Sequence, residues 1–418
     1  MYSITHSEQV VLSFKEARHT VEQHAAGVQP IEKETVTLLA AVNRVLAEEI
    51  HADRDLPPFP RATRDGFAVR AEGVSRVPAT LEVAGEIRAG DSPEKYEYSV
   101  DASHAIEIMT GAPVPRGADA VVMVEYTRRA GSRVEIQRSV KSAENVVPQA
   151  AECRAGQLLL SPGTRLSPAA LGLAASVGKA QVQVYQKPRV AILSTGDEII
   201  DVDKQPAANQ IRNSNTYSLA GQLQAAGAVP VPLAIAPDRL EPLRALVHEG
   251  LNSDLLLISG GVSMGKYDLV EQVLSESGAE FYFTGAQIQP GKPVVFGRVG
   301  GRGTPTYFFG LPGNPVSTMV CFELFARAMI DALSGAGPTP MQFLQARLKS
   351  DVRTKTGLTR FLPAMLSGEF GEVEVELVRW QGSGDMVSTA RANCYLVIPP
   401  DRERIAEGEM VAVLRTQA

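Results

Sequence analysis

Ser259-Gly260-Gly261-Val262-Ser263-Met264-Gly265-Lys266-Tyr267-Asp268 is the stretch of sequence that decides the fold of this chain. The residues just before it, 254–258, form a short apolar run of the length typical of a buried parallel strand. Just after it, apolar residues recur at helical spacing, at Leu269, Val270, Val273 and Leu274. The sequence therefore predicts a strand, a glycine-rich turn and a helix, and at such a place in an open α/β sheet ligands bind.

The side chains of this turn suit an anion and a metal ion. Gly260 and Gly261 allow the backbone to approach a ligand closely, and their N–H groups can point at an anion. Ser263 adds a hydroxyl, Lys266 adds a cation, and Asp268 adds a carboxylate able to hold a hard metal ion. The alternative is a turn that merely connects a strand to a helix, which is the usual role of a single Gly-Gly turn.

Two further turns favour the ligand-binding interpretation. A predicted strand at 189–193 ends in Ser194-Thr195-Gly196-Asp197-Glu198, and another at 307–309 opens into Gly310-Leu311-Pro312-Gly313-Asn314-Pro315-Val316-Ser317 before a long helix. From residue 188 onward strands alternate with helices, which predicts a doubly wound parallel sheet. Several such turns in one sheet indicate a binding or catalytic core.

The N-terminal half has a different pattern. Residues 13–26 predict an amphipathic helix and residues 39–50 predict a second one. From about residue 80 to residue 138 the sequence is rich in strands and turns, which indicates a compact β domain. Helix and short strand return after Asn145, so this β domain is predicted to be inserted between two halves of another domain.

Two turns in this half carry polar side chains of interest. Asp65-Gly66 follows a segment stiffened by prolines, and a carboxylate held on such a turn can face a ligand. Thr110 begins a rigid, proline-containing turn at 109–115, which taken alone is more typical of structure than of binding. At the other end of the chain, residues 341–418 read as strand and turn and predict a small barrel or sandwich.

The predicted organisation is a multidomain α/β protein. Its expected domains are a discontinuous helix-and-strand domain at 1–54 and 146–186, an inserted β domain at 55–145, a doubly wound α/β domain at 187–336, and a C-terminal β-barrel at 337–418. A length of 418 residues agrees with several domains, because one hydrophobic core rarely grows that large.

Composition excludes several classes of function. The net charge of −6 gives no electrostatic reason to expect nucleic acid or an anionic membrane as a partner. No apolar run approaches the ~20 residues that a membrane helix needs, and the N-terminus does not resemble a signal peptide. The three scattered cysteines suit a reducing compartment, so a cytoplasmic location is expected. All six histidines precede the central stretch, which argues against a histidine metal centre or a Ser-His-Asp triad.

With these features in view, the chain resembles a known family, the MoeA-type molybdopterin molybdenumtransferases or molybdenum insertases, to which the E domain of gephyrin also belongs. The resemblance covers nearly the whole chain. Its motifs, in order, are Asp65-Gly66-Phe67-Ala68-Val69-Arg70, Met109-Thr110-Gly111-Ala112-Pro113, Ser194-Thr195-Gly196-Asp197-Glu198, Ser259 to Asp268, Pro290-Gly291-Lys292-Pro293 and Leu311-Pro312-Gly313-Asn314-Pro315.

The resemblance implies an enzyme of molybdenum cofactor biosynthesis that takes adenylylated molybdopterin and molybdate, inserts the metal into the dithiolene and releases AMP in a Mg²⁺-dependent step. It further implies a homodimer joined through the first domain, with a cleft between the third and fourth domains of one subunit and the second domain of the other. Other proteins of molybdenum cofactor biosynthesis are candidate partners.

The resemblance also assigns roles to residues of this chain. A pyrophosphate and a molybdate dianion both need N–H donors, hydroxyls and cations, which agrees with the chemistry of the turns. The expected catalytic residues are Asp65, Thr110, Asp268 and Lys292. The expected substrate-binding residues are Ser194, Thr195, Gly196, Gly260, Gly261, Ser263, Asn314, Pro315 and Ser317, and the expected Mg²⁺ ligands are Asp197, Glu198 and Asp268. Ser383 is a further candidate donor, although its loop setting favours a structural role.

Alternatives remain open for two of these side chains. Asp197 and Asn314 could instead cap helices.

Three segments depart from the family pattern. Gln289 stands where the family commonly has a lysine. Residues 147–152 have lost an arginine-rich stretch that ends in Gly-Glu-Asp, and residues 62–64 read Ala-Thr-Arg in place of Ser-Ala-Met. Each lost cation would weaken the binding of a buried dianion by ~1.5–3 kcal/mol.

The departures motivate a second hypothesis, a divergent, non-catalytic paralogue that binds molybdopterin or acts as a scaffold. A third hypothesis is a molybdopterin adenylyltransferase, against which the motifs of the second and fourth domains argue. The sequence leaves open the preference for molybdate or tungstate, and whether this chain is its host's sole insertase.

Overall fold

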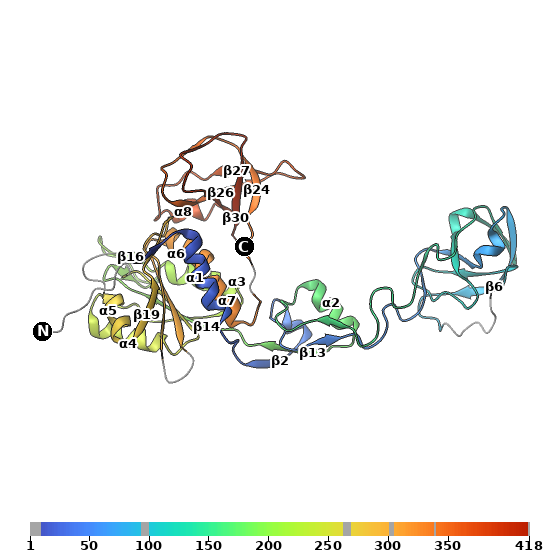
Figure 1. The fold of residues 1–418 in the computed structure, drawn as a ribbon, viewed down its shortest axis with the longest axis horizontal. Helices are drawn as coiled ribbons and strands as arrows, with labels where there is room; N and C mark the ends of the chain where they lie inside the picture. Colours follow the sequence, from blue (N-terminus) through green and yellow to red (C-terminus); the bar gives the residue numbers. More distant parts are fainter. Residues whose placement is uncertain (1–9, 93–99, 262–268, 301–304, 338–339, 417–418) are drawn as a thin grey trace. The chain divides into compact units, whose positions relative to one another are not determined.

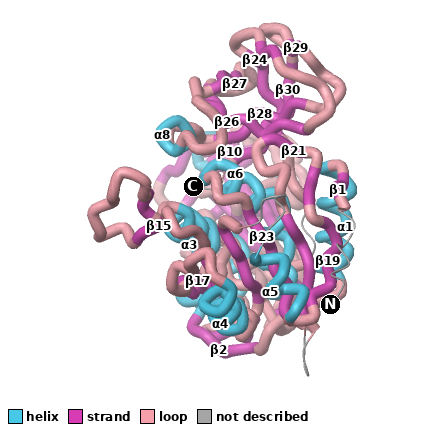
Figure 2. Tube along the Cα trace, turned by 90° about the vertical axis from the view of Figure 1, so that its left-hand side faces the viewer, coloured by secondary structure: helices cyan, strands magenta, loops and turns pink. Residues whose placement is uncertain are grey.

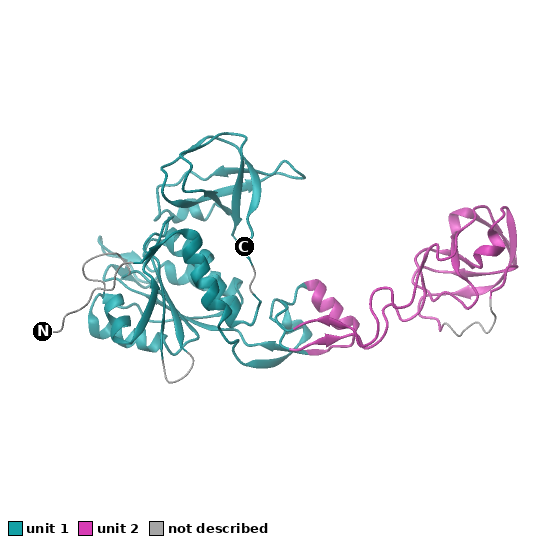
Figure 3. Cartoon of the chain, viewed as in Figure 1, with its two compact units in different colours: residues 1–47, 162–167, 182–418 teal, residues 48–161, 168–181 magenta. Residues whose placement is uncertain are grey.

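The computed structural model describes residues 10–92, 100–261, 269–300, 305–337 and 340–416. The chain forms two compact units, which Figure 3 shows in different colours. The first unit comprises residues 1–47, 162–167 and 182–418, and the second comprises residues 48–161 and 168–181. The four predicted domain boundaries stay a prediction.

A six-stranded sheet organises the first unit (Figure 1). Its order is β17 (Val229–Pro232), β14 (Arg189–Ser194), β18 (Leu255–Ser259), β23 (Thr306–Leu311), β22 (Val295–Val299) and β19 (Ala279–Phe283). The first four strands are parallel, whereas β22 pairs antiparallel with both β23 and β19. The predicted doubly wound parallel sheet is thus antiparallel at this edge, because residues 300–305, which separate β22 from β23, are too few for a parallel crossover.

Helices cover both faces of this sheet, which confirms the doubly wound arrangement. On one face lie α1 (Phe14–Ala26), α3 (Asn215–Ala225), α6 (Pro315–Cys321) and α7 (Arg327–Leu333), and on the other lie α4 (Leu240–Gly250) and α5 (Leu269–Glu276). The side chains of β18 alternate between the two faces: Leu255 and Leu257 join the first core, and Leu256 and Ile258 join the second.

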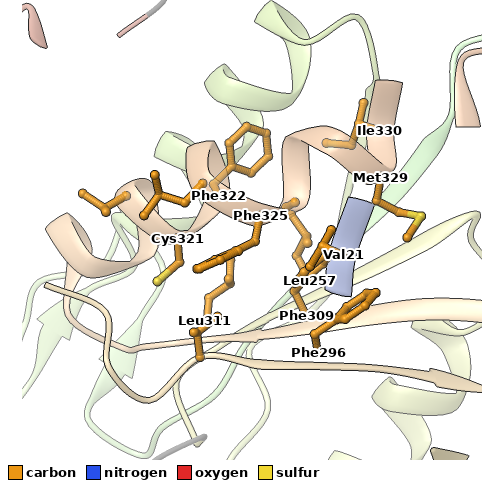
Figure 4. Packing of buried hydrophobic residues seen from close by; sticks show 14 of the residues in the cluster. Val21, Leu257, Phe296, Phe309, Leu311, Cys321, Phe322, Phe325, Met329 and Ile330 are labelled. Atoms are coloured by element: carbon orange, nitrogen blue, oxygen red, sulfur yellow. The ribbon is translucent and has the colours of Figure 1, made fainter. Parts of the chain in front are cut away.

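The larger core lies beneath one continuous helical run. A π-helical segment, Phe322–Ala326, joins α6 to α7. In Figure 4, Phe322, Phe325 and Met329 of this run lie over the sheet residues Leu257 and Phe309, and all five are fully buried. The helix α1 packs against this core through Val21. Ser13 caps its start in a reciprocal capping box with Glu16, and the predicted helix at 13–26 is confirmed.

The predicted second helix, at 39–50, is wrong. Only Leu38–Ala41 forms a short 3₁₀ turn, and Asn43 has a left-handed φ of 59° that ends it. The chain then extends, and Val45 and Leu46 make β-bridges to Arg165 and Val184. Tertiary pairing therefore overrides the helical spacing of the apolar residues in this segment.

The C-terminal part of the first unit is a closed barrel, as predicted. It consists of β24 (Leu344–Leu348), β26 (Thr359–Ser367), β27 (Glu374–Leu377), β28 (Cys394–Ile398) and β30 (Met410–Arg415). The sheet closes because β26 pairs with β28 as well as with β27 (strands magenta in Figure 2). A short strand, β21 (Ile288–Gln289), adds to the start of β26, and a short helix, α8 (Met386–Thr389), interrupts the predicted run of strands and turns.

The second unit contains the predicted β-rich region. Its six-stranded sheet has the order β8 (Ala120–Met123), β5 (Gly66–Val69), β7 (His104–Ile108), β6 (Ala79–Ile87), β10 (Arg133–Ile136) and β9 (Thr127–Ala130). Apolar clusters cover both of its faces. The unit also holds α2 (Pro168–Ser176) and the pair of β3 (Ile50–His51) with β12 (Leu158–Leu160). Across the described ranges, every helix is too short or too polar to cross a bilayer.

Candidate functional site

The predicted ligand-facing turns begin side by side at the carboxyl ends of the parallel strands of the α/β sheet. Ser194 at the end of β14 is in register with Ser259 at the end of β18, which is in register with Leu311 at the end of β23. Hydrogen bonds continue past the strands: the Thr195 amide donates to the Ser259 carbonyl (3.0 Å) and the Gly260 amide donates to the Leu311 carbonyl (3.1 Å). The structure thus brings together segments that lie far apart in the sequence.

Close approach explains the glycines of the central turn. Gly260 and Gly261 both have left-handed φ angles, 91° and 63°. A Cβ on Gly261 would lie 2.7 Å from Thr195 Oγ1 and 2.8 Å from Val270 Cγ2, so a side chain is excluded there. Thr195 Oγ1 is itself buried and has no hydrogen-bond partner among the described residues. Folded proteins rarely leave a buried hydroxyl unpaired, so this one calls for a partner that the described residues do not supply.

Asn215, which the sequence analysis did not single out, ties two of the turns together. Its Nδ2 donates to Ser259 Oγ (2.7 Å) and to the Gly313 carbonyl (2.8 Å). Its Oδ1 is buried and accepts from no described residue. Ser194 belongs to the neighbouring network, in which its hydroxyl lies 3.2 Å from Asn213 Oδ1. The only sequence signal for these residues was the polar run that precedes α3.

A cavity of about 460 Å³ adjoins these turns within the first unit. Four residues predicted or considered as ligands lie in its wall, namely Lys292, Asn314, Ser317 and Ser383. Asn314 and Pro312 come from the turn after β23, so the cavity and the strand-end turns share that turn. The remaining wall residues are Ile288, Gln289, Pro290, Gly291, Pro293, Leu358, Trp380 and Gly382.

Asn314 does not act as a side-chain cap. It occupies the position before α6 but makes no capping hydrogen bond to that helix. Instead its Nδ2 donates to Ser383 Oγ (2.9 Å), and the Ser383 carbonyl accepts from the Val316 amide (3.0 Å). Ser383 therefore holds the loop before α8 against the start of α6, and its hydroxyl lies in the wall of the cavity.

Two of the three carboxylates predicted as Mg²⁺ ligands, Asp197 and Glu198, follow the end of β14 but do not form a complete metal site by themselves. Asp197 precedes a short strand, β15 (Ile199–Ile200), so its alternative role as a helix cap is wrong. Its Oδ1 accepts from the Asp238 amide (3.1 Å). Partial burial raises the pKa of Asp238, and the charges of Asp197 and Glu198 act in the same direction. Asp238 is a further carboxylate that sequence analysis missed.

Within the described ranges, no three histidine, cysteine or acidic side chains are placed to hold a metal ion together. The predicted ligand Asp268 and the predicted phosphate donor Ser263 lie outside the described residues. The chemistry of Asp197 and Glu198 nevertheless fits Mg²⁺, because this ion usually binds through one or two carboxylates together with phosphate and water. The accumulated negative charge that acts on Asp238 is the kind a divalent cation relieves.

In the second unit the predicted pair Asp65 and Thr110 are in direct contact. Asp65 Oδ1 accepts from the Thr110 amide (2.6 Å) and from Thr110 Oγ1 (2.7 Å). These hydrogen bonds lower the pKa of the Asp65 carboxyl. The turn needs Gly66, since a Cβ there would lie 1.9 Å from the Val122 carbonyl oxygen. The result is an exposed carboxylate held ionised and in one orientation.

Comparison with known proteins agrees with this arrangement. Three family models match the chain in order: the MoeA N-terminal region (domains I and II) at residues 12–178, a probable molybdopterin binding domain at 191–332, and the MoeA C-terminal region (domain IV) at 345–415. A molybdopterin molybdenumtransferase from Nostoc sp. is 35% identical over 390 residues, which cover 91% of this chain and 88% of that protein.

The chain belongs to the MoeA family of molybdopterin molybdenumtransferases. A second MoeA-family relative, from Bacillus subtilis, is 34% identical over 393 residues, which cover 92% of this chain and 90% of the relative. The crystal structure of a molybdopterin biosynthesis MoeA protein from Pyrococcus horikoshii OT3 matches with a TM-score of 0.79 at 28% identity, over 97% of this chain and 100% of that one.

Family membership confirms the resemblance seen in the sequence motifs and the multidomain MoeA fold with its C-terminal barrel. The strand-end turns lie within the region that matches the molybdopterin binding domain. Trp380 and Ser383, which line the cavity, lie within the region that matches the MoeA C-terminal model. Trp380 is the chain's single tryptophan, and the sequence analysis gave it no role.

Proposed function

We propose that the chain is a molybdopterin molybdenumtransferase that inserts molybdenum from molybdate into adenylylated molybdopterin and releases AMP, in molybdenum cofactor biosynthesis. One observation carries this proposal: the cavity wall that contains Lys292 shares the turn at 312–314 with the glycine-rich strand ends. An oxyanion and a nucleotide-linked pterin would then bind next to each other.

The strand-end turns are the proposed site of the nucleotide-linked pterin. Phosphate oxygens need backbone N–H donors and hydroxyls at close range, and Gly260 and Gly261 permit that approach. Thr195 Oγ1 and Asn215 Oδ1 are buried without partners among the described residues, so they offer one donor and one acceptor to the substrate. Ser194, Gly196 and Ser263 complete the proposed set.

The cavity is the proposed molybdate site. Lys292 supplies the cation, and Ser317 and Ser383 supply hydroxyl donors. Asn314 orients Ser383 by donating to its oxygen, so the serine O–H remains free to donate to the anion. Pro315 begins the helix that carries Ser317 and fixes its start. A positioned donor to developing negative charge is typically worth ~2.7–4 kcal/mol of transition-state stabilisation.

A divalent cation and a second subunit complete the proposal. Asp197, Glu198 and Asp268 would hold Mg²⁺, which supplies charge neutralisation at the phosphates when bound. The protein is proposed to act as a cytoplasmic homodimer, in which Asp65 and Thr110 of one chain serve the site of the other. Asp65 suits such a role because its two hydrogen bonds from Thr110 keep it ionised.

AMP release tests the proposal directly. The purified full-length chain is incubated with adenylylated molybdopterin, molybdate and Mg²⁺, and AMP and bound molybdenum are measured over time. Both should appear in equal amounts and both should depend on molybdate. Absence of AMP with every divalent cation tried would overturn the proposal, and adenylylation of molybdopterin from ATP would assign the chain to adenylyl transfer instead.

A further inference from the structure

A buried arginine lies directly behind the wall of the cavity. Gln289 of β21 and Arg360 of β26 are paired residues in the ladder that joins these two strands. Arg360 is only 6% exposed, whereas Gln289 is exposed and lies in the cavity wall. Arg360 Nε donates to Gln289 Oε1 over 2.8 Å. The two side chains therefore form a hydrogen-bonded pair, in which the charged Arg360 is buried and the Gln289 side chain lies in the cavity wall.

The described surroundings of Arg360 supply carbonyl acceptors but no counter-ion. Its Nη1 donates to the backbone carbonyls of Lys355 and Leu358. No carboxylate lies within ion-pair distance of it in the part of the chain that the structure describes, and burial lowers the pKa of its guanidinium. Burying an ionised group without a counter-ion is costly, so folded proteins usually pair such a group. The guanidinium is thus held by three carbonyl oxygens and by no described carboxylate, so its positive charge stays behind the cavity wall without a counter-ion among the described residues.

The contact with Arg360 also fixes which end of the Gln289 amide faces the guanidinium. A guanidinium has only donors, so the atom that faces it must be the carbonyl oxygen of the amide. The usual ambiguity between the oxygen and nitrogen of a glutamine is absent here for that reason. The NH₂ group of Gln289 then points away from Arg360, and it donates to no described residue.

We propose that Arg360 is a positioning residue for the oxyanion: it holds the Gln289 carboxamide so that its NH₂ group, polarised by the buried positive charge, donates to the anion beside Lys292. Gln289 Nε2 is the group that touches the anion, and Arg360 acts through it. This inference rests on the proposed function for the identity of the anion, which is a tetrahedral metal oxyanion such as molybdate or tungstate.

The test measures binding of molybdate alone, and of tungstate alone, to the full-length chain by calorimetry. Gln289→Ala removes the donor and should weaken molybdate binding about tenfold. Gln289→Glu keeps an acceptor for Arg360 but replaces the donor with a negative charge, so it should abolish binding while the melting temperature stays unchanged or rises. Gln287→Glu introduces the same charge at an exposed neighbour outside the cavity wall and should leave binding within about twofold.

Coupling between the two residues decides the positioning role. Arg360→Leu should weaken molybdate binding as much as Gln289→Ala, and the double variant should be no weaker than either single variant. Arg360→Lys should restore binding only in part, because one ammonium cannot reproduce the two-sided guanidinium contact. Additive losses, or full binding by Gln289→Ala, would overturn the inference. Gln289→Ala and Gln289→Glu alter an exposed side chain, so they test the Gln289 donor even if Arg360→Leu does not fold, and Arg360→Lys alone and combined with Gln289→Ala then measures the coupling.

The readout separates this inference from the function it rests on. Adenylylated molybdopterin should bind all of these variants as it binds the unaltered chain, because the strand-end turns are untouched. If the unaltered chain releases AMP but the variants bind molybdate normally, the inference fails and the function stands. If no AMP is released but molybdate binding depends on both residues, the function fails and the anion site stands.

Discussion

Asn314 Nδ2 donates to Ser383 Oγ over 2.9 Å, and this hydrogen bond links the turn after β23 of the α/β sheet to the loop before α8. Both residues lie in the wall of the same cavity. The bond uses the serine oxygen as an acceptor and leaves its hydrogen for another partner. The loop that carries Ser383 thereby contributes to the same cavity wall as Lys292.

Ser383→Ala should raise the KM for molybdate about tenfold, because one hydrogen bond to a charged group is lost. The KM for adenylylated molybdopterin should change less than twofold. Steady-state AMP release at varied molybdate concentration measures both values. Ser367→Ala, at an exposed serine of the same barrel, is the control. An equal rise of both KM values would contradict a molybdate-specific role.

Gly261→Ala should weaken binding of adenylylated molybdopterin at least about tenfold, because the new Cβ would press on Thr195 Oγ1 and displace it. Gly278→Ala is a matched control, since Gly278 also has a left-handed φ (79°) but open space around it. Both variants should lose about 1–2 kcal/mol of stability from backbone strain. Calorimetric titration with adenylylated molybdopterin measures the binding, and thermal melts of both variants measure the stability. Equal binding of this ligand by the two variants would refute the role of the close contact.

Removal of Mg²⁺ with EDTA should abolish AMP release, and added Mg²⁺ should restore it. Asp197→Asn should raise the Mg²⁺ concentration needed for half-maximal rate about tenfold, because a carboxylate ligand is lost. Bound Mg²⁺ should also lower the pKa of Asp238, which the charges of Asp197 and Glu198 now help to raise. Carboxyl NMR measures that pKa without reference to activity. Asp203→Asn, at an exposed carboxylate further along the chain, should change neither quantity.

Thr110→Val should raise the pKa of Asp65, because one of its two hydrogen-bond donors is removed and the backbone amide remains. The folded-state pKa of Asp65 is depressed, so its contribution to stability is present above the unfolded pKa and is lost as pH falls through the folded pKa. If ionised Asp65 is needed, the acid limb of the rate profile should move to higher pH in this variant. Thr80→Val, at an exposed threonine of the same sheet, should leave the profile in place.

Asp65→Ala and Lys292→Ala should each lose activity, and a mixture of the two dissociated and reassociated variants should recover about a quarter of it. Half of randomly formed dimers would be mixed, and each mixed dimer would hold one site with both residues intact. AMP release by the mixture, compared with each variant alone, measures the recovery. A mixture as inactive as its components would show that one chain supplies both residues to its own site.

The sequence predicted those parts of the fold in which local pattern and tertiary setting agree. The helix at 13–26 combined helical spacing with a capping serine, and the apolar run at 255–258 forms most of β18 because both faces of the sheet are covered. Residues 39–50 had the same apolar spacing, but the chain extends after the 3₁₀ turn at Leu38–Ala41, where Val45 and Leu46 pair with Arg165 and Val184. The antiparallel edge of the sheet was missed because strand direction depends on connection length and not on apolar pattern.

In the candidate site, too, the sequence predicted some residues and missed others. The glycines and hydroxyls of the turns at 194–196, 259–261 and 312–314 were visible in the sequence because turn chemistry is local. Asn215, Asp238 and Arg360 were not, because each acts through a contact with a residue distant in sequence. Ser383 was considered as a donor but was judged structural, since nothing near it in the sequence marks the cavity.

By itself the sequence determined the family, the order of the folded regions and the residue types that approach an anion, since these follow from local spacing and from backbone freedom at glycine. Only the tertiary structure decided that Lys292, Asn314 and Ser383 line one cavity, and that Arg360 is buried behind Gln289. Strand pairing between β21 and β26 brings that arginine behind the cavity wall, and it joins residues 71 positions apart, so neighbours along the chain do not reveal it.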